Sequence, residues 1–321
     1  MPGKNPDLFH GYFRPDGFFE GWYFRIRWEG RSICFIPGVA VGDDPHAFVQ
    51  VIDSEGLGAY NLRYPLADFS CGARTPAVRV GQNLFSLSHI RPDLKDVGLS
   101  LTGALALSEV RTYPDWWLGR GSMGCVGGLA FLECYTQICA LDGRVDGTLV
   151  LNGRALDIRG GRLYVEKNWG HSFPKAYCWV QGDFGEDVGL ACSIGRVPVG
   201  GTSFDGMVAC LRHGDRLYHF HTLRGGGYDL DNSRKGTWLT ARCGRYALKL
   251  RVKGGHPLRL AAPIRGSMGG AAYECLDATA SLMRFDLDTG ACLLQRSGRE
   301  IGLEIGGRWL PEETSPPVSP L

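Results

Sequence analysis

Two aromatic-rich segments of the sequence also carry carboxylates. The first, Phe18–Arg25, reads Phe-Phe-Glu-Gly-Trp-Tyr-Phe-Arg and places Glu20 two residues before Trp22. The second, Tyr164–Pro174, reads Tyr-Val-Glu-Lys-Asn-Trp-Gly-His-Ser-Phe-Pro and carries Glu166. An apolar interior favours the protonated form of a carboxylic acid, which can then donate its proton near neutral pH. Because aromatic faces stabilise a cation, these residue types together indicate protonation of a carbon–carbon double bond.

The alternation of side chains along a strand divides the second segment between two faces. Tyr164, Glu166 and Asn168 share one face, and Lys167 and Trp169 share the other. Glu166 is therefore the candidate general acid, and Tyr164 and Asn168 are candidates for orienting it or the nucleophile. An alternative stays open, in which Glu166 is held in a structural ion pair and the aromatic side chains simply fill a core.

The candidate substrate-binding residues lie within or shortly after these two segments: Trp22, Glu20, Trp169, Trp179, Gln181 and His171. The three tryptophans would shape an apolar cavity and shield a cation, although strand parity also fits Trp169 as core packing. Arg25 and Lys175 are the basic neighbours that could hold Glu166 in an ion pair. In that case Glu20 would be the next acid to consider.

Other catalytic chemistries have weaker support. His219 and His221 share a strand face, which suits metal ligands, but no carboxylate or cysteine stands at a supporting spacing. The sequence contains no Gly-x-Ser-x-Gly nucleophile elbow. The segment Gly119–Gly124 matches Gly-x-Gly-x-x-Gly, but it opens no helix that could receive a pyrophosphate. We therefore expect no metal and no other cofactor.

The composition excludes several classes of partner. The 321 residues include 35 basic and 33 acidic side chains, for a net charge of +2, without the concentrated positive charge of a nucleic-acid binder. No apolar run approaches the roughly 20 residues of a membrane-spanning helix, and the first residues show no secretory signal. The expected partner is a hydrophobic small-molecule substrate. Peripheral contact with membrane lipid is compatible with such a substrate, whereas nucleic acid and a transmembrane segment are not expected.

The cysteines indicate a reducing compartment. Eleven are scattered along the chain, and none forms Cys-x-x-Cys. The pair Cys134 and Cys139 lacks the spacing of a zinc site. Buried thiols fit this pattern better than disulfides do, so we expect a cytoplasmic location.

Glycine-rich punctuation predicts an all-β fold. The chain has 47 glycines, and roughly fifteen short runs of β-branched or aromatic residues lie between them, a pattern of strands and tight turns. No window sustains the spacing of an amphipathic helix. Barrels or sandwiches are the natural ways to close so many strands.

The expected organisation has two halves. We place an N-terminal segment at 1–17, one half at 18–155, a second at 156–310 and a disordered tail at 311–321, whose prolines and acidic residues have little to bury. One pentapeptide, Arg-Gly-Ser-Met-Gly, occurs twice, at Arg120–Gly124 and at Arg265–Gly269. This repeated pentapeptide fits either two similar units or coincidence in a glycine-rich chain.

In these residues the chain resembles the tocopherol cyclase-like family. Three segments carry the resemblance: Phe19–Phe24, Tyr164–Pro174 with Trp179-Val180-Gln181 after it, and Glu304–Gly307. The pattern Tyr-x-acid-x-Asn-Trp-Gly is also similar to that of the related carotenoid 1,2-hydratases, which are lipocalin-like two-domain proteins. The resemblance implies two lipocalin-like halves with an apolar cleft. It also implies that Glu166, beside Tyr164, protonates an alkene.

The resemblance leaves the reaction open between several outcomes. Tocopherol cyclases protonate a prenyl double bond of a prenylated hydroquinone, and the phenol oxygen captures the cation, whereas hydratases capture a similar cation with water. The chain departs from the family pattern at His171, where a small residue is usual, and at Asp183, where asparagine is expected. We expect a cyclase acting on a prenylated aromatic or other isoprenoid. The alternatives are a pericyclic or hydratase-type cyclase of natural-product biosynthesis and a non-catalytic lipid or isoprenoid carrier.

Overall fold

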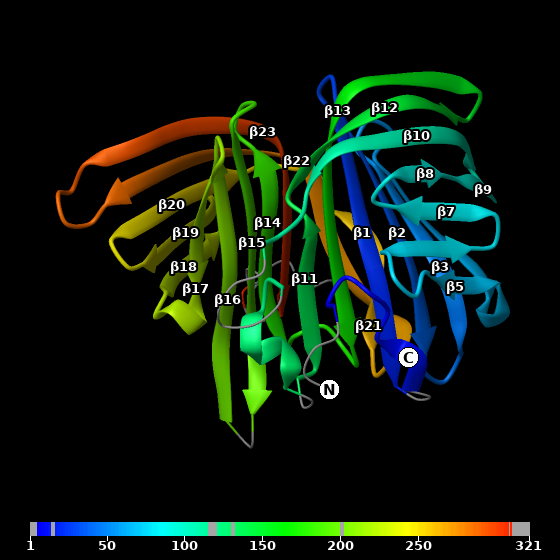
Figure 1. Ribbon diagram of the computed structural model, residues 1–321, viewed down its shortest axis with the longest axis horizontal. Helices are drawn as coiled ribbons and strands as arrows, with labels where there is room; N and C mark the ends of the chain where they lie inside the picture. Colours follow the sequence, from blue (N-terminus) through cyan, green and yellow to red (C-terminus); the bar gives the residue numbers. More distant parts are fainter. Residues whose placement is uncertain are drawn as a thin grey trace. The chain divides into compact units, whose positions relative to one another are not determined.

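The chain is built almost entirely of strands. The computed structural model describes residues 5–13, 17–114, 121–129, 132–199, 202–307 and 309. These residues form twenty-three strands and four short 3-10 helices, arranged in two sheets (Figure 1). The prediction of an all-β chain with two barrel-like halves is confirmed, and the tail at 311–321 lies outside the described residues. No helix in the described part of the chain is long and apolar enough to cross a membrane.

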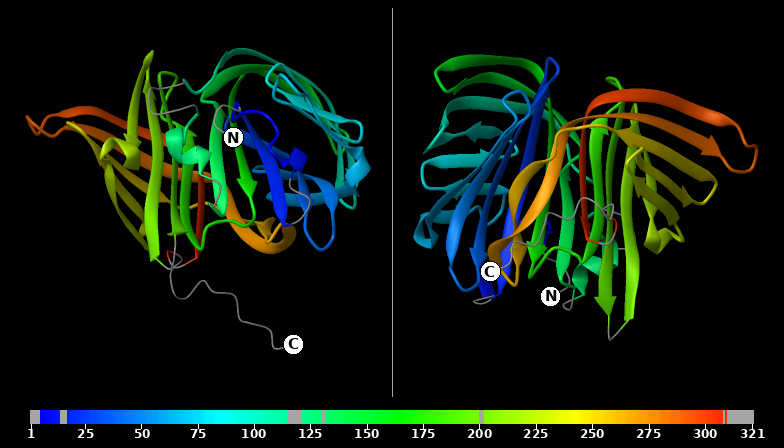
Figure 2. Two further views of the ribbon diagram at one scale, coloured as in Figure 1. Left: turned by 60° about the horizontal axis from the view of Figure 1, so that its bottom comes forward. Right: turned by 180° about the vertical axis from the view of Figure 1, so that it is seen from behind.

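The first compact unit comprises Met1–Phe173 and Leu258–Ala271. Its strands before residue 173 are β1 (Phe18–Trp28), β2 (Arg31–Val41), β3 (His46–Asp53), β4 (Gly58–Pro65), β5 (Phe69–Cys71), β6 (Ala77–Val80), β7 (Asn83–Ser86), β8 (His89–Arg91), β9 (Asp93–Asp96), β10 (Leu99–Arg111), β11 (Cys134–Ala140), β12 (Asp142–Leu151) and β13 (Arg154–Gly170), with the 3-10 helices η1 (Gly11–Phe13), η2 (Leu66–Asp68) and η3 (Gly124–Gly128). Hydrogen bonds order them β4-β3-β2-β1-β13-β12-β10-β8-β7-β6-β5, with β11 beside β13 and β9 beside β10. The sheet curls until β6 lies near β2 and β3. It therefore forms a nearly closed barrel, which Figure 2 shows from two sides.

The second compact unit comprises Pro174–Pro257 and Ala272–Leu321. Its elements are β14 (Ala176–Asp183), β15 (Val188–Val199), β16 (Thr202–His213), β17 (Arg216–His221), η4 (Thr222–Arg224), β18 (Gly227–Ser233), β19 (Gly236–Cys243), β20 (Tyr246–Lys253), most of β22 (Ser267–Asp286) and β23 (Cys292–Gly307). The strands run in the order β17-β16-β15-β14-β23-β22-β20-β19-β18. Because β17 also approaches β19, this sheet too encloses an interior.

Each unit has its own apolar core, formed by alternate side chains of its strands. In the first unit Trp22, Phe24 and Ile26 of β1 contribute to one cluster of buried residues. In the second unit Val180 of β14 and Leu282 of β22 contribute to the other. Burying each of these side chains stabilises the fold by about 1.5–3 kcal/mol. Each unit is therefore stabilised by a core of its own.

The division between the units differs from the expected boundary at residues 155 and 156. Strand β13 runs through that point without interruption. Asn152 and Gly153 both have positive φ, 50° and 82°, as the two-residue turns favoured in hairpins require. The chain therefore stays in the first unit until Phe173 and enters the second unit at Pro174.

A later segment returns to the first unit. Strand β21 (Leu258–Ile264) pairs with β22, and its Ala261 is held by the side chain of Gln50. The Gln50 amide donates to the Ala261 carbonyl (3.1 Å) and accepts from the Ala261 N–H (2.8 Å). No pattern in the sequence marks this return.

The repeated pentapeptide does not correspond to a structural repeat. In the first copy the described residues Gly121–Gly124 lie in a turn that leads into η3. In the second copy Arg265 and Gly266 form a turn between β21 and β22. The repeated letters therefore reflect the glycine-rich composition.

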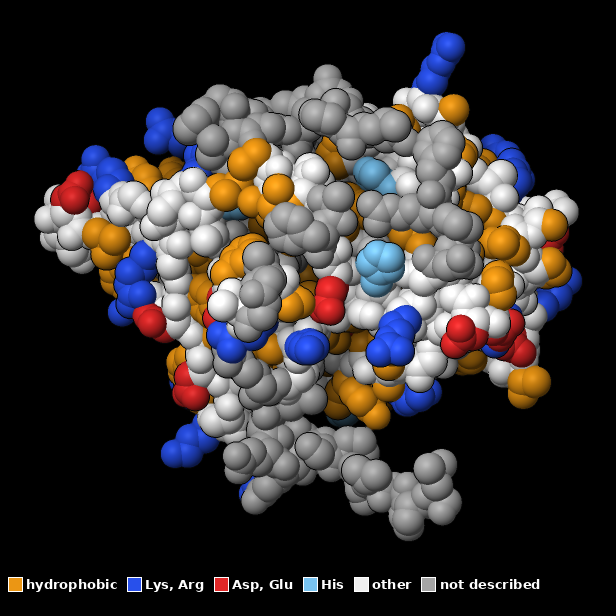
Figure 3. Space-filling view, turned by 90° about the horizontal axis from the view of Figure 1, so that it is seen from below, with side chains coloured by type: hydrophobic (Ala, Val, Ile, Leu, Met, Phe, Trp, Pro, Cys, Tyr) orange, Lys and Arg blue, Asp and Glu red, His pale blue; other side chains and the backbone are white. Residues whose placement is uncertain are grey.

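Charges are mixed over the surface. On the face in Figure 3, basic and acidic side chains are interspersed, in keeping with a net charge of +2. This arrangement gives a nucleic-acid backbone no concentrated positive field on that face.

Candidate active site

The predicted catalytic residues lie on β13, between two neighbouring strands. Along its second half β13 pairs with β1 on one edge and with β11 on the other, both antiparallel. Glu166 stands opposite Tyr23 of β1 and Ile138 of β11. Gly170 ends the strand with a φ of 145°, and a side chain there would lie 2.2 Å from the carbonyl of Glu133. The glycine thus permits the close approach of β11 and β13.

Glu166 is the centre of a hydrogen-bonded group that we call the acid cluster: Glu166, Tyr164, Asn168 and Thr136. The Tyr164 hydroxyl donates to Glu166 Oε2 (2.7 Å). The Asn168 amide and the Thr136 hydroxyl donate to Oε1, each at 3.1 Å. Tyr164, Glu166 and Asn168 therefore share one face of β13, as the alternation of side chains predicts.

The acid cluster can deliver or receive a proton. Glu166 is only 3% exposed. The three donors named above are neutral groups, and the buried Arg25, which stands opposite Tyr164 on β1, lies on the same face of the sheet. Hydroxyl groups accept as well as donate hydrogen bonds, so Tyr164 and Thr136 can remain bonded to the carboxyl group in either protonation state. Such a site can hold a carboxylic acid in one fixed orientation.

The opposite face of the same strands carries a second buried group, the ion-pair cluster: Glu20, Lys167 and His10. Glu20 and Lys167 are both 0% exposed, and their Oε1 and Nζ atoms lie 2.7 Å apart. The ammonium also donates to the carbonyl of Leu8 and to His10 Nδ1 (3.0 Å). The backbone N–H of His10 donates to Glu20 Oε2 (2.8 Å). The N-terminal residues 8–10 are thereby tied to this end of the barrel.

Two of the predicted cavity tryptophans pack against the ion-pair cluster rather than against the acid cluster. Trp22 stands opposite Lys167, and Trp169 stands opposite Glu20. The Lys167 ammonium lies 5.2 Å from the Trp22 ring centre and 4.7 Å from that of Trp169, and the His10 ring stacks on Trp169 at 4.2 Å. These indoles already face a cation, so the structure separates Trp22, Trp169 and Glu20 from Glu166.

Trp179 and Gln181 lie in the second unit, on β14. They alternate with the core residues Cys178 and Val180 and therefore face away from that unit's apolar core. On the same face, the Tyr177 hydroxyl donates to Glu304 Oε1 (2.5 Å). The predicted substrate-binding residues are therefore divided between the two units.

His171 has a local structural role. Its side chain is exposed, and Nδ1 contacts the carbonyl of Gly17, while its backbone N–H donates to Glu133 (2.8 Å). It links the end of β13 to the residue before β1. None of these hydrogen bonds involves Glu166.

Sequence reasoning missed Thr136 and His10. Thr136 stands opposite Asn168, and only the pairing of β11 with β13 brings its hydroxyl to Glu166. His10 precedes the first strand, and it reaches Glu20 because the N-terminal segment folds back over the barrel end. Neither residue lies in a motif, so no local signal could have marked it.

The described residues offer little for metal or thiol chemistry. No group of three or more metal-binding side chains occurs among them. His221 Nδ1 accepts from the N–H of Leu223 (2.9 Å), and burial lowers the pKa of His219 to about 4. None of the eleven cysteines forms a disulfide. Burial raises the pKa of Cys178 and Cys210 to about 12, which disfavours a nucleophilic thiolate.

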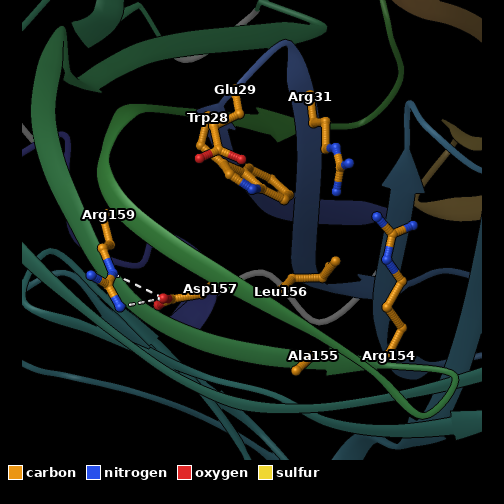
Figure 4. A pocket seen from close by; sticks show the side chains of 8 residues that line it. All are labelled: Trp28, Glu29, Arg31, Arg154, Ala155, Leu156, Asp157 and Arg159. Carbon is orange, nitrogen blue, oxygen red and sulfur yellow. Dashed lines mark hydrogen bonds and ion pairs between the residues drawn. The ribbon is translucent and has the colours of Figure 1, made fainter.

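A pocket of about 510 Å³ lies at the other end of β1 and β13, and its lining is mostly charged (Figure 4): Trp28, Glu29, Arg31, Arg154, Ala155, Leu156, Asp157 and Arg159. Arg159 pairs with Asp157, and Arg31 and Arg154 both pair with Glu55. No predicted site residue lines it. Charged linings suit polar ligands, so this pocket is not the predicted apolar cleft.

The fold and the acid cluster define a class: a protein of two β-barrel-like units, one of which holds a buried glutamic acid bonded to a phenol, an amide and a hydroxyl. The profile of the tocopherol cyclase-like family matches residues 107–307, which include the whole acid cluster. The chain belongs to the tocopherol cyclase-like family. Family membership indicates an enzyme of the cyclase or hydratase kind.

Similarity to individual proteins is limited in extent. A protein of Oryza sativa subsp. japonica named "Probable tocopherol cyclase, chloroplastic" is 32% identical over 62 residues, which are 19% of this chain and 13% of that one. The chloroplastic tocopherol cyclase of Zea mays is 33% identical over 58 residues, 18% of this chain and 12% of its own. The chain thus matches about an eighth of the length of these curated relatives.

A solved structure shares the fold. The crystal structure of kievitone hydratase from Nectria haematococca aligns with a TM-score of 0.50 and 13% sequence identity, over 96% of both chains. The lipocalin-like two-unit architecture therefore extends over nearly the whole chain.

Proposed function

We propose that this protein is a cyclase that protonates a carbon–carbon double bond of a hydrophobic prenylated aromatic or other isoprenoid, with Glu166 as the general acid. The observation that carries the proposal is the bond of 2.7 Å between the Tyr164 hydroxyl and the buried Glu166 carboxyl group. Family membership supports the same class of chemistry. The reaction names of the plant relatives supply the model for the substrate.

The proposed reaction conserves atoms and charge. Glu166 gives its proton to the less substituted alkene carbon, and a tertiary cation forms at the other carbon. The phenol oxygen of the substrate then bonds to that carbon and loses its proton, which returns to the Glu166 carboxylate. No electrons are gained or lost in the cycle, so the proposed reaction needs no redox cofactor.

The neighbours of Glu166 have positioning roles in this proposal. Asn168 and Thr136 donate to Oε1, and we assign the transferred proton to Oε2, which the Tyr164 hydroxyl contacts. Fixing a donor in one orientation is a large part of what an active site contributes to rate. The substitution Glu166→Gln keeps the shape of the side chain but removes the transferable proton.

The test is turnover of a polyprenyl hydroquinone followed by mass spectrometry. We expect the wild-type protein to give a product of unchanged mass in H2O, and in D2O a product that is one mass unit heavier because the protonated carbon carries deuterium. Glu166→Gln should lower turnover by about 10²–10⁴-fold, the usual contribution of general acid catalysis, with little change in substrate affinity. The matched control is Glu20→Gln, which alters a glutamate on the opposite face and should keep the turnover of each folded molecule.

The other outcomes distinguish the alternatives. A product heavier by one water would establish a hydratase, and substrate recovered unchanged would establish a carrier. If Glu166→Gln binds substrate and turns it over at the wild-type rate, Glu166 is not the acid. If that variant loses stability and binding together, Glu166 is a structural ion-pair partner.

We also propose that the protein works in a reducing compartment such as the cytoplasm. The absence of a disulfide among its eleven cysteines supports this proposal. Titration of about eleven free thiols in protein denatured without added reductant would agree with it, and mostly oxidised cysteines would contradict it.

A further inference from the structure

The interior of the second unit contains a buried arginine. Arg284 lies on β22, opposite Leu248 of β20 and Leu294 of β23. Both leucines belong to the apolar core of the unit, as does Leu282 two residues earlier on the same strand face. Only 5% of Arg284 is exposed. Its guanidinium is therefore a permanent positive charge within an apolar interior.

Two tyrosines pack against the guanidinium. Its central carbon lies 3.8 Å from the ring centre of Tyr218 and 5.6 Å from that of Tyr246. The two rings meet edge to face at 5.4 Å. Stacking of this kind stabilises a guanidinium through its flat faces, whereas its N–H bonds lie in the plane and point elsewhere.

Two of the three guanidinium nitrogens of Arg284 lack hydrogen-bond partners. Its Nε and Nη1 atoms are buried and make no hydrogen bond among the described residues. The nearest carboxylate along this strand face, Asp286, is bonded to Arg245 Nε (3.0 Å) and to the backbone N–H of Asp288 (3.0 Å). Asp286 is therefore committed to other partners.

Two other arginines with a buried Nε differ from Arg284, because their terminal nitrogens make hydrogen bonds. Arg162 donates to Asp142 (2.8 Å), and the buried Arg212 donates to the carbonyl of Asp187 (3.1 Å). Burying a charged group without hydrogen bonds is costly, and a bound ion or ligand that accepts these hydrogen bonds would remove that cost.

We propose that Arg284 binds an oxyanion, the carboxylate or phosphate group of a small molecule, in the interior of the second unit. A guanidinium presents its N–H bonds as a planar fork that matches two oxygens of such a group. The surrounding apolar side chains strengthen the attraction, because charges interact more strongly where water is excluded. The two tyrosines hold the fork in one orientation. This site is separate from the acid cluster, and it does not depend on the reaction proposed there.

The test compares two arginine variants of the full-length protein in the presence of defined anions. Arg284→Met removes the proposed anion-binding group, and Arg251→Met is the matched control, since the exposed Arg251 of β20 also packs on an aromatic ring, 5.0 Å from that of Trp238. The probes are inorganic phosphate, dodecanoate and the uncharged dodecanol, at constant ionic strength. The measurement is the melting temperature as a function of probe concentration.

We expect dodecanoate or phosphate to raise the melting temperature of the wild-type protein and of Arg251→Met saturably, by about 3 °C at ten times the dissociation constant. Arg284→Met should show no such rise, and without a probe it should melt at the wild-type temperature or above it. A response to phosphate alone would identify a free oxyanion, and a response to dodecanoate alone would identify the carboxylate of an amphiphile. The proposal is overturned if neither anion shifts the wild-type protein, if dodecanol acts as strongly as dodecanoate, or if Arg284→Met responds like the wild type.

Discussion

Glu166 and Glu20 are both buried glutamates on neighbouring strands of the first unit, but they point to opposite faces of the sheet and have different partners. Glu166 receives hydrogen bonds from Tyr164, Asn168 and Thr136. Glu20 lies 2.7 Å from the buried ammonium of Lys167. Both glutamates are buried, so the comparison turns on their neighbours: the ammonium of Lys167 contacts Glu20, and the phenol of Tyr164 bonds Glu166. The buried Arg25 lies on the same face of the sheet as Glu166, so substitutions at both glutamates are needed to separate a proton donor from a structural ion-pair partner.

The largest effect that the comparison predicts is on stability. Glu20→Gln leaves the ammonium of Lys167 buried without its counter-charge, which should lower the free energy of unfolding by about 3–5 kcal/mol. Denaturant titration of the variant measures this loss. The double variant Glu20→Gln/Lys167→Met removes the cation as well, and it should recover most of the stability.

An exposed ion pair supplies the control for this prediction. Arg63 and Asp44 pair at the surface, where such a pair contributes about 0–1 kcal/mol, so Arg63→Gln should change stability little. If Glu20→Gln is no more damaging than Arg63→Gln, the ion-pair cluster does not hold the barrel end. If the double variant is less stable than Glu20→Gln, Lys167 stabilises the fold without its partner.

The next prediction compares a tyrosine that contacts the acid cluster with one on the ion-pair side of the sheet, and the expected effect on turnover is smaller. Tyr164→Phe removes the hydroxyl that bonds Glu166 but keeps the ring. We expect turnover to fall about tenfold, which corresponds to the loss of a hydrogen bond of about 1.4 kcal/mol. Steady-state kinetics with a polyprenyl hydroquinone measures the change.

Tyr135→Phe is the matched control on the ion-pair side. Tyr135 stacks on Trp169 at 5.2 Å and donates its hydroxyl to the carbonyl of Leu129. Its loss should lower stability by about 1 kcal/mol and leave the turnover of each folded molecule unchanged. Equal losses of turnover in the two variants would mean that the phenol of Tyr164 has no special role.

The sequence predicts part of this arrangement because strand alternation is a local property. The period of two assigns Glu166 and Lys167 to opposite faces without knowledge of any neighbouring strand. The partners of each residue depend on pairing between distant segments, as when β11 brings Thr136 to Glu166. Full burial of Lys167 was also beyond the sequence, since a lysine is rarely buried unless it is paired.

The organisation into units was predictable in outline only. Glycine-rich punctuation and the absence of helical periodicity are sufficient for an all-β fold. The hairpin turn at Asn152 and Gly153 carries the chain past the expected boundary, and the return of Leu258–Ala271 to the first unit depends on the contact of Ala261 with Gln50. Long-range contacts of this kind leave no periodic signal in the residues that make them.

The last prediction concerns a half-buried base rather than a buried acid. Burial lowers the pKa of His219 from 6.5 to about 4, and the charges of Arg224 and His221 act in the same direction. Between about pH 6.5 and pH 4 the unfolded chain binds a proton at this imidazole that the folded chain does not bind. The free energy of unfolding should therefore decrease as the pH is lowered through that window, and this contribution should level off below about pH 4. His219→Gln removes the titrating group, so its stability should depend less steeply on pH in the same range. Urea titrations at several pH values measure both slopes, with the exposed His256, which pairs with Asp277, replaced by Gln as the control. Identical slopes for His219→Gln and the wild-type protein would show that His219 gains its proton as readily in the folded chain as in the unfolded one, and that its burial is no barrier to charge.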